Sequence, residues 1–260
     1  MRSLWLTIVA MLAAPQLASA HPLYLTGTIG TAPVLLMIER DDTALSGWYL
    51  YLRQGKQIRL EGKVAADGAF TLDEFGGPKS QKTGQFDGRI ARGQWTGVWR
   101  KPEQQATLPL RLTEGADVLS NLSGRFTCAT KKVDREFGYT YRHTLSLRVT
   151  RGAVKAFDVK RGETGTHGED QACVIALSDV KQEKSDSGIL LRTHGSSSAT
   201  GPRCTIRLIG AGDYLYVQMG DWTESGNDCR GDDEAMYCSP RSFWADMIVN
   251  RKTHACVTVE

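Results

Sequence analysis

Apolar and polar residues alternate along residues 21–115 with the period of two that is typical of β-strands. Turn-forming residues, among them Gly30, Asp41-Asp42 and Asp67-Gly68, separate the alternating segments at short intervals. The pattern predicts eight strands, at Leu23 to Ile29, Val34 to Arg40, Leu45 to Arg53, Gln57 to Val64, Ala69 to Asp73, Gly84 to Ile90, Gly93 to Arg100 and Ala106 to Leu112.

The short connections between these strands predict how they pair. Loops of two to five residues join neighbouring strands in antiparallel fashion, which gives a meander. Eight consecutive strands leave exposed edges unless the sheet curls, so a barrel or a strongly twisted half-barrel is favoured. Glycines precede strand aromatics at Gly47-Trp48, Gly84-Gln85-Phe86 and Gly93-Gln94-Trp95. They predict either relief of crowding in a curled sheet or, alternatively, a row of aromatics lining a ligand groove.

The chain from residue 122 also reads mainly as strands, separated by longer polar loops. Predicted loops cover residues 160–171 and the Ser-rich residues 193–202, and no helix of more than a few turns is expected. The strands are predicted at Arg125 to Thr130, Tyr139 to Thr150, Val154 to Val159, Ala172 to Leu177, Gly188 to Thr193, Cys204 to Ile209, Tyr214 to Met219 and Phe243 to Val249.

The first twenty residues predict export from the cytoplasm. Arg2, an apolar run from Leu4 to Ala14 and the Ala18-Ser19-Ala20 site form a secretory signal peptide, so the mature chain should begin at His21. No other apolar run is long enough to span a membrane, and the expected location is periplasmic or secreted.

Export changes how the cysteines are interpreted. In an oxidising compartment an even set is most simply a set of disulfides, and no C-x-x-C pair points to zinc. We expect a disulfide between Cys229 and Cys238, which flank a short polar loop, and the sequence leaves the remaining pairings open. The six cysteines are Cys128, Cys173, Cys204, Cys229, Cys238 and Cys256.

All six cysteines follow residue 120, which predicts two domains. A cysteine-free antiparallel β-meander would cover residues 21–115, and a disulfide-bonded β domain residues 122–260. The formal net charge of the precursor is +3, with 12 basic and 10 acidic residues in 21–115 and 19 of each from 116 onward. Neither part is basic enough to predict nucleic-acid binding.

The densest acidic segment lies between Cys204 and Cys256 and is the predicted contact surface for a protein partner. A covalently closed loop loses less entropy on binding, and Trp and Arg are enriched at binding hot spots. The alternatives are a solvated loop or a calcium site, although the spacing does not match an EF-hand and no metal is expected. The predicted contact residues are Asp221, Trp222, Asp228, Arg230, Asp232, Asp233 and Glu234.

Motifs for catalysis and cofactor binding are missing from the sequence. It contains no G-x-S-x-G, no H-E-x-x-H and no phosphate-binding glycine motif, so no catalytic residue and no cofactor is predicted. An enzyme with scattered catalytic residues stays open as an alternative.

The second half resembles small periplasmic inhibitors of lysozyme. The resemblance lies in Phe126-Thr127-Cys128 opening a strand, in Cys256 near the end of the chain and in the acidic loop between them. It implies a disulfide-tied β-structure that inserts a polar loop into an enzyme cleft. The chain departs from that pattern in its higher cysteine count and its additional N-terminal domain.

These patterns together predict an exported all-β binding protein and favour an inhibitor or immunity-type protein that acts on a cell-envelope enzyme through the acidic loop. The alternative is an envelope carbohydrate-binding protein or hydrolase that uses N-terminal aromatics, namely Trp48, Tyr51, Trp95 and Trp99. The two differ in their expected salt dependence, because screening weakens binding through charges and leaves binding through aromatic stacking almost unchanged.

Overall fold

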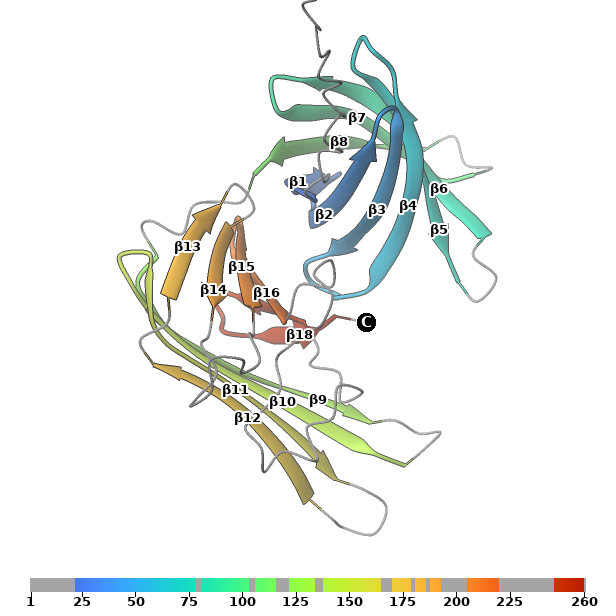
Figure 1. The fold of residues 1–260 in the computed structure, drawn as a ribbon. Helices are drawn as coiled ribbons and strands as arrows, with labels where there is room; N and C mark the ends of the chain where they lie inside the picture. Colours follow the sequence, from blue (N-terminus) through green and yellow to red (C-terminus); the bar gives the residue numbers. More distant parts are fainter. Residues whose placement is uncertain are drawn as a thin grey trace, which may run out of the picture.

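The computed structural model is built from β-strands arranged as a closed barrel and two further sheets (Figure 1). It describes residues 22–77, 81–102, 106–115, 122–133, 138–164, 170–178, 181–185, 188–192, 205–219 and 246–259. The all-β class and the barrel predicted from the sequence are confirmed.

The barrel is an eight-stranded antiparallel meander in which β1 pairs with β8 and closes the sheet. Its side chains alternate between an apolar interior and the outside, as the period of two requires. Closure removes the free edges that an open meander of this length would expose. The strands are β1 (Leu23–Ile29), β2 (Ala32–Asp41), β3 (Ala44–Tyr51), β4 (Gln57–Val64), β5 (Ala69–Gly76), β6 (Gln81–Ala91), β7 (Gln94–Arg100) and β8 (Thr107–Glu114).

Glycines at inward-facing positions make this narrow barrel sterically possible. A Cβ atom on Gly62 would lie 1.9 Å from the Thr71 carbonyl oxygen, and one on Gly97 would lie 2.2 Å from that of Asp87. Neighbouring strands therefore approach more closely than any side chain permits, which matches the role of glycine at tight bends of a curled sheet. Gly47, one of the glycines that precede a strand aromatic, makes a similar close approach, because a Cβ atom there would lie 2.0 Å from the Met37 carbonyl oxygen.

The second half forms two antiparallel sheets, ordered β12-β11-β10-β9 and β13-β14-β15-β16-β17-β18. Buried residues of both sheets build one core cluster between them, including Phe157, Leu147, Leu208 and Val217. The strands are β9 (Gly124–Val133), β10 (Thr140–Thr150), β11 (Ala153–Thr164), β12 (Asp170–Ser178), β13 (Lys181–Ser185), β14 (Gly188–Arg192), β15 (Thr205–Ala211), β16 (Tyr214–Met219), β17 (Met247–Asn250) and β18 (Cys256–Thr258).

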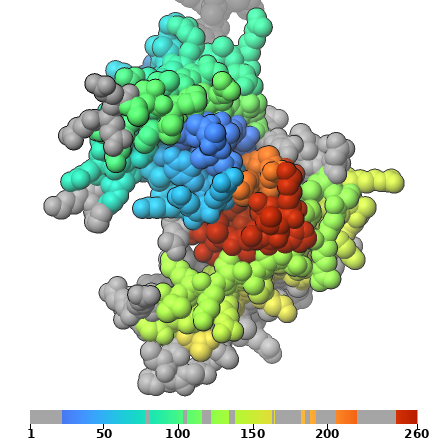
Figure 2. Space-filling view, turned by 180° about the vertical axis from the view of Figure 1, so that it is seen from behind, coloured from blue at the N-terminus to red at the C-terminus, as the bar shows by residue number. Residues whose placement is uncertain are grey.

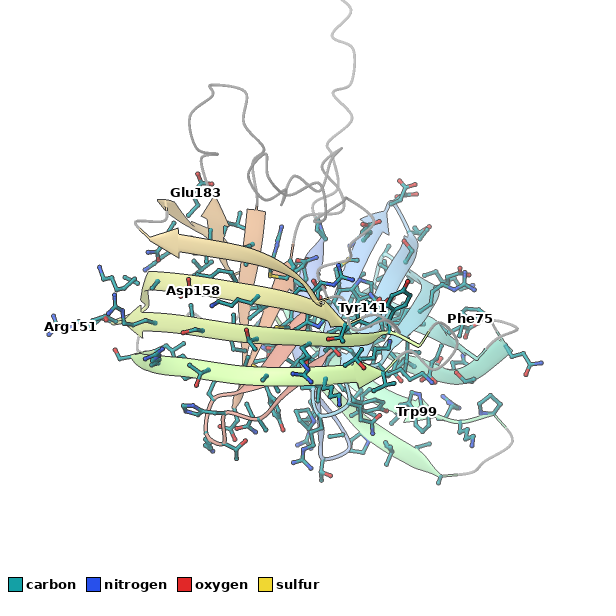
Figure 3. All side chains as sticks on the ribbon, turned by 90° about the horizontal axis from the view of Figure 1, so that it is seen from below. Phe75, Trp99, Tyr141, Arg151, Asp158 and Glu183 are labelled. Carbon is teal, nitrogen blue, oxygen red and sulfur yellow. A yellow bond between two sulfur atoms is a disulfide. The ribbon has the colours of Figure 1, made fainter. Side chains whose placement is uncertain are left out.

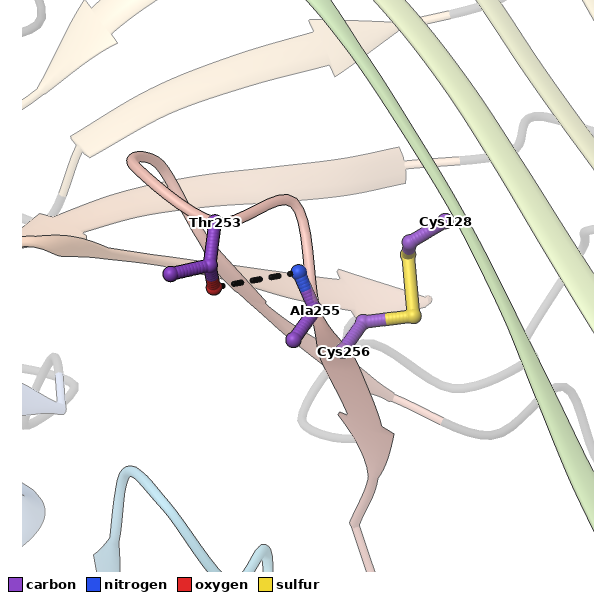
Figure 4. The surroundings of a disulfide bond; sticks show 4 residues. All are labelled: Cys128, Thr253, Ala255 and Cys256. Atoms are coloured by element: carbon purple, nitrogen blue, oxygen red, sulfur yellow. Dashed lines mark hydrogen bonds between the residues drawn. A yellow bond between two sulfur atoms is a disulfide. The ribbon is translucent and has the colours of Figure 1, made fainter.

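One disulfide joins the two sheets along one side. Cys128 lies on the edge strand β9 and Cys256 on the edge strand β18, with their Cα atoms 5.8 Å apart (Figure 4). The bond links residues separated by 128 positions and covers one open side of the apolar core. The expected Cys229–Cys238 pair, Cys204 and the side chain of Cys173 lie outside the described residues.

The six-stranded sheet packs against the barrel with its other face. A third cluster combines outward-facing barrel residues such as Leu35 and Leu50 with Ile209 and Ile248 of the sheet. Strands β15 to β17 are therefore buried on both faces, between the barrel wall and the four-stranded sheet. Figure 2 shows the C-terminal strands, in red, seated between the blue strands of the barrel and the green strands of the outer sheet.

A buried polar layer accompanies this apolar contact. The Tyr24 hydroxyl donates to Gln218 Oε1 at 2.9 Å, and the Arg207 guanidinium lies over the Tyr24 ring at 5.1 Å. Tyr216 donates a short hydrogen bond to Asp246. Burial raises the pKa of the Asp246 carboxyl to about 6, although its hydrogen bonds from Tyr216 and the Met219 amide oppose the shift.

The sequence prediction is wrong for several strands of the second half. Residues 160–171 were expected to form a loop, but β11 runs to Thr164 and β12 begins at Asp170. Strands β13 and β18 were not expected at all. Each of these segments is polar or very short, so its residues do not alternate between apolar and polar as a strand's usually do. Backbone hydrogen bonding to a neighbouring strand makes it extended instead.

Candidate functional site

The barrel has two ends, and the inward-facing polar residues lie at these ends. Arg40 and Glu114 lie at the inward positions where β2 and β8 end, whereas Glu74 lies near the opposite end on β5. The residues between the ends are apolar and packed, with exposures of 0 to 3% for Leu36, Leu60 and Phe70. The barrel interior is therefore a packed apolar core, and the charged side chains lie at its two ends.

The end that carries Arg40 opens into a cavity of about 460 Å³, which we call the Trp95 mouth. This volume lies within the range of small-molecule sites, about 300 to 1,000 Å³. Apolar side chains predominate in its wall, and the charged groups come from the strand ends and the β2–β3 turn. The lining residues are Leu23, Ile38, Arg40, Asp42, Leu45, Ile90, Trp95 and Glu114.

Trp95 holds one side of the mouth in place. It is only 2% exposed, its ring packs on Phe70 with centroids 4.8 Å apart, and its Nε1 donates to Glu114 Oε1 at 2.8 Å. The indole is anchored by packing and by a charge-assisted hydrogen bond, so it presents a fixed wall to the cavity.

Arg40 and Asp42 form the part of the rim that comes from β2 and the β2–β3 turn. Arg40 Nε donates to the backbone oxygen of Asp42 at 2.8 Å, which directs the exposed guanidinium along the β2–β3 turn. Asp42 itself adopts a left-handed conformation with φ of 51°, a conformation that Asp tolerates better than most residues. The rim thus offers both a cation and carboxylates to the polar part of a bound molecule.

The opposite end of the barrel contains a buried carboxylate, and we call its surroundings the Glu74 cluster: Glu74, Tyr49, Thr83 and Trp99. Oε2 of Glu74 accepts from the Tyr49 hydroxyl at 2.7 Å and from Trp99 Nε1 at 2.8 Å. Oε1 accepts from the Thr83 hydroxyl at 2.7 Å. Three donors therefore compensate a carboxylate that is 6% exposed, as burial of a charge demands.

Gly84 makes the contact between Trp99 and Glu74 possible. A Cβ atom there would lie 2.4 Å from Trp99 Nε1 and 2.8 Å from Glu74 Oε2. The indole reaches the carboxylate by crossing directly over the glycine. Burial, and then the neighbouring Glu74 charge, raise the pKa of Tyr49 far above its ordinary value, so this hydroxyl stays protonated and acts as a donor.

The N-terminal aromatics predicted as one binding face do not share a face. Trp48 points outward and packs edge-on against Tyr216 at the contact with the six-stranded sheet, with centroids 6.0 Å apart. Trp95 lies at one end of the barrel interior, whereas Tyr51 and Trp99 lie toward the other. Figure 3 places Trp99 at the outer end of the barrel, near Phe75.

The acidic loop predicted to contact a partner, which contains Asp221, Trp222, Asp228, Arg230, Asp232, Asp233 and Glu234, lies outside the described residues. Within the residues that the structure describes, no group of three or more His, Cys, Asp and Glu is placed to hold a metal ion. No helix of the described part is long and apolar enough to cross a membrane.

Sequence reasoning missed the charged residues of the barrel ends, although a signal was present. Glu74 continues the inward series of Phe70 and Leu72 on β5, and Arg40 continues that of Leu36 and Ile38 on β2. A charge at an inward position of an apolar series is the observation that could have marked both sites. The buried His143 was missed too: it is 5% exposed, and neither ring nitrogen has a hydrogen-bond partner among the described residues.

Known proteins offer no comparison from which a function could be transferred. No family model, no curated protein and no solved structure matches the chain. The function has to be inferred from the residues of this chain.

Proposed function

We propose that this protein is an exported, non-catalytic binding protein and that the Trp95 mouth holds a compact small molecule with an apolar body. The observation that carries the proposal is the cavity of about 460 Å³ at one end of a closed barrel, with an apolar wall and a charged rim. Small-molecule sites combine these two features, and barrel mouths are among their usual places.

The packed interior limits the shape of the ligand. Leu25, Leu36 and Tyr49 lie deeper in the barrel, are at most 1% exposed and leave no channel. A compact ligand therefore fits better than a long chain. Its apolar body would lie against Leu45, Ile90 and the other aliphatic residues, and its polar group would stay at the rim beside Arg40 and Glu114.

The lining residues favour binding over catalysis. The rim supplies one guanidinium and two carboxylates, and the Glu114 carboxylate already accepts the Trp95 indole hydrogen. Among the described residues that line the mouth, none is a serine, cysteine or histidine. Export is supported by the signal-like N-terminal sequence and by the Cys128–Cys256 disulfide, which fits an oxidising environment outside the cytoplasm.

Fluorescence of 8-anilinonaphthalene-1-sulfonate, an apolar anion of suitable size, tests this proposal. We expect the folded protein to enhance the dye's emission. Octanoate should displace the dye if the rim binds an anion more tightly, and octylammonium should displace it if the rim binds a cation more tightly. The variant Ile90→Trp fills the mouth and should abolish the enhancement. Leu108→Trp is the matched control, since Leu108 is 40% exposed at the opposite end of β8. Equal enhancement by both variants and the original protein would refute the site.

The inhibitor role stays a separate prediction, because its contact residues lie outside the described part of the chain. Its test is retention of an envelope protein by the oxidised mature chain. Retention should be lost when four acidic residues are changed to amides, and equal retention by both forms would refute it. The residues to change are Asp228, Asp232, Asp233 and Glu234.

A further inference from the structure

The four-stranded sheet turns its polar face away from the rest of the molecule, and basic residues gather on this outer face. Alternation places Phe126, Leu145 and Phe157 in the core, so their neighbours in sequence point outward. Figure 3 looks onto this face from below, with Asp158 labelled on β11. The exposed outward-facing cations are Arg125, Lys131, Arg142, Arg148 and Lys160.

These five cations have no ion-pair partner among the described residues. Ion pairs of the described residues include those of Arg59, Arg89 and Arg100 on the barrel and that of Lys252 in the β17–β18 turn. Asp158 is the one acidic residue at the outward-facing positions of β9, β10 and β11. A cluster of like charges that the described residues do not compensate is a feature of anion-binding surfaces.

The register gives the basic residues a definite arrangement. Arg125 lies opposite Arg148 near one end of the strands, and Lys131 lies opposite Arg142 near the other. Six residues along β9 separate the two pairs, which corresponds to roughly 20 Å at about 3.3 Å per residue. Lys160 lies between them on β11, opposite Thr144. An extended anionic chain that follows the strands would meet all five.

A shallow hollow occupies the face between the two basic pairs. Its volume is about 450 Å³, and it is lined by the hydroxyl-bearing Thr127, Thr144 and Ser146, by the charged Asp158 and Lys160, and by Cys128, Ala129 and Leu145. Hydroxyls and a carboxylate form hydrogen bonds with the hydroxyl groups of a sugar chain. Among the described residues that line the hollow, none is an aromatic on which a base could stack. The exposed apolar residue of this lining is Ala129, whose methyl group is too small to anchor the face in a bilayer.

We propose that the outer face of the β9–β12 sheet binds an acidic polysaccharide, a polymer of sugars that carry carboxylate groups. The five cations pair with its carboxylates, and the hydroxyl-lined hollow accepts its sugar hydroxyls. This site is independent of the Trp95 mouth and extends the function beyond small-molecule binding.

Calorimetric titration of the oxidised mature protein with polygalacturonate oligomers tests the proposal, with neutral dextran oligomers as the reference. An exposed charge pair contributes about a two- to fivefold change in affinity, so changing all five cations to glutamine should weaken binding by roughly 100-fold. Binding should also weaken as salt rises. The matched control removes five exposed cations of the barrel, namely Lys56, Lys63, Arg92, Lys101 and Arg111, and should change the affinity less than threefold.

A second variant keeps the test decisive if the glutamine variant does not fold. Thr144→Glu combined with Ser146→Glu places negative charge in the hollow without removing any cation, and it should abolish polygalacturonate binding. Failure of the original protein to bind polygalacturonate would overturn the proposal, as would equal loss in the control variant. Preferential binding of oligothymidylate or of phosphatidylglycerol vesicles would also overturn it. Ile90→Trp should leave this binding unchanged, which separates this test from that of the mouth.

Discussion

Removing the hydroxyl of Tyr49 measures how much the buried Glu74 carboxylate stabilises the barrel. In the structure this hydroxyl donates to Glu74 Oε2 at 2.7 Å, inside a core where Tyr49 is 1% exposed. A hydrogen bond to a charged acceptor contributes about 1.5 to 3 kcal/mol. We therefore expect Tyr49→Phe to lower the free energy of unfolding by about 2 kcal/mol, measured by urea denaturation followed by circular dichroism.

A double-mutant cycle with Glu74→Gln separates the hydrogen bond from other effects. The amide keeps an acceptor toward Tyr49 and Trp99 and can donate to the Thr83 hydroxyl, so only the charge is lost. Tyr49→Phe should then cost about 1 kcal/mol less in the Gln background than in the original protein.

Tyr24→Phe serves as the matched control for this cycle, because its hydroxyl donates to Gln218 on the outside of the barrel. Its effect should add to that of Glu74→Gln within about 0.5 kcal/mol. If the Tyr49 and Glu74 changes were equally additive, the carboxylate would not be held by the Tyr49 hydroxyl and the reasoning would be refuted.

Four further predictions concern individual residues of the fold. Gly84→Ala should destabilise the barrel by about 2 kcal/mol or more and shift the Trp99 emission, because the new Cβ displaces the indole from Glu74; an unchanged unfolding curve would contradict this. Asp246 has a raised pKa of about 6, so its protonated carboxyl contributes folding stability that is fully present below pH 4 and is lost as the pH rises through 6. Asp246→Asn should therefore be more stable than the original protein at pH 7, by about 1 to 3 kcal/mol, and should lose the advantage at pH 4. Burial, followed by the charge of Arg161, lowers the pKa of His143 to about 4. Acidification below the ordinary pKa of histidine therefore protonates the unfolded state first and destabilises the protein, so the His143→Gln variant should unfold at a lower pH than the original protein. Replacing Cys128 and Cys256 by alanine removes a cross-link between residues 128 positions apart, and the chain-entropy model gives a loss of about 5 kcal/mol; a loss below about 1 kcal/mol in denaturant titration would contradict it.

The first half of the fold could be predicted from the sequence because local and global signals agree there. Each of the eight barrel strands carries its own alternation and its own turn residues, as at Asp67-Gly68, where Gly68 has φ of 84°. The predicted bounds differ by only a few residues, for example Val34 to Arg40 against Ala32–Asp41 in β2. Closure through β1 and β8 was one of the two expected forms.

The second half depends on contacts that no local pattern encodes. Lys181–Ser185 is polar throughout and becomes strand β13 only because β14 pairs with it. The Cys128–Cys256 bond joins edge strands of two sheets, and cysteine spacing alone leaves fifteen pairings for six cysteines. The Trp95 mouth was missed for a similar reason: Trp95 and Glu114 lie on the paired strands β7 and β8, but Arg40 on β2 joins them only through the β1–β8 closure.

Nuclear magnetic resonance of the indole N–H groups tests the central claim most directly, because each of the two barrel ends contains one tryptophan whose indole N–H donates to a glutamate. Titration with 8-anilinonaphthalene-1-sulfonate should shift the Trp95 signal and the methyl signals of Ile38, Leu45 and Ile90, which line the mouth. The Trp99 signal, held by Glu74 at the other end, should stay in place. Shifts at Trp99 in place of Trp95, or no shift at either, would contradict a ligand site in the Trp95 mouth.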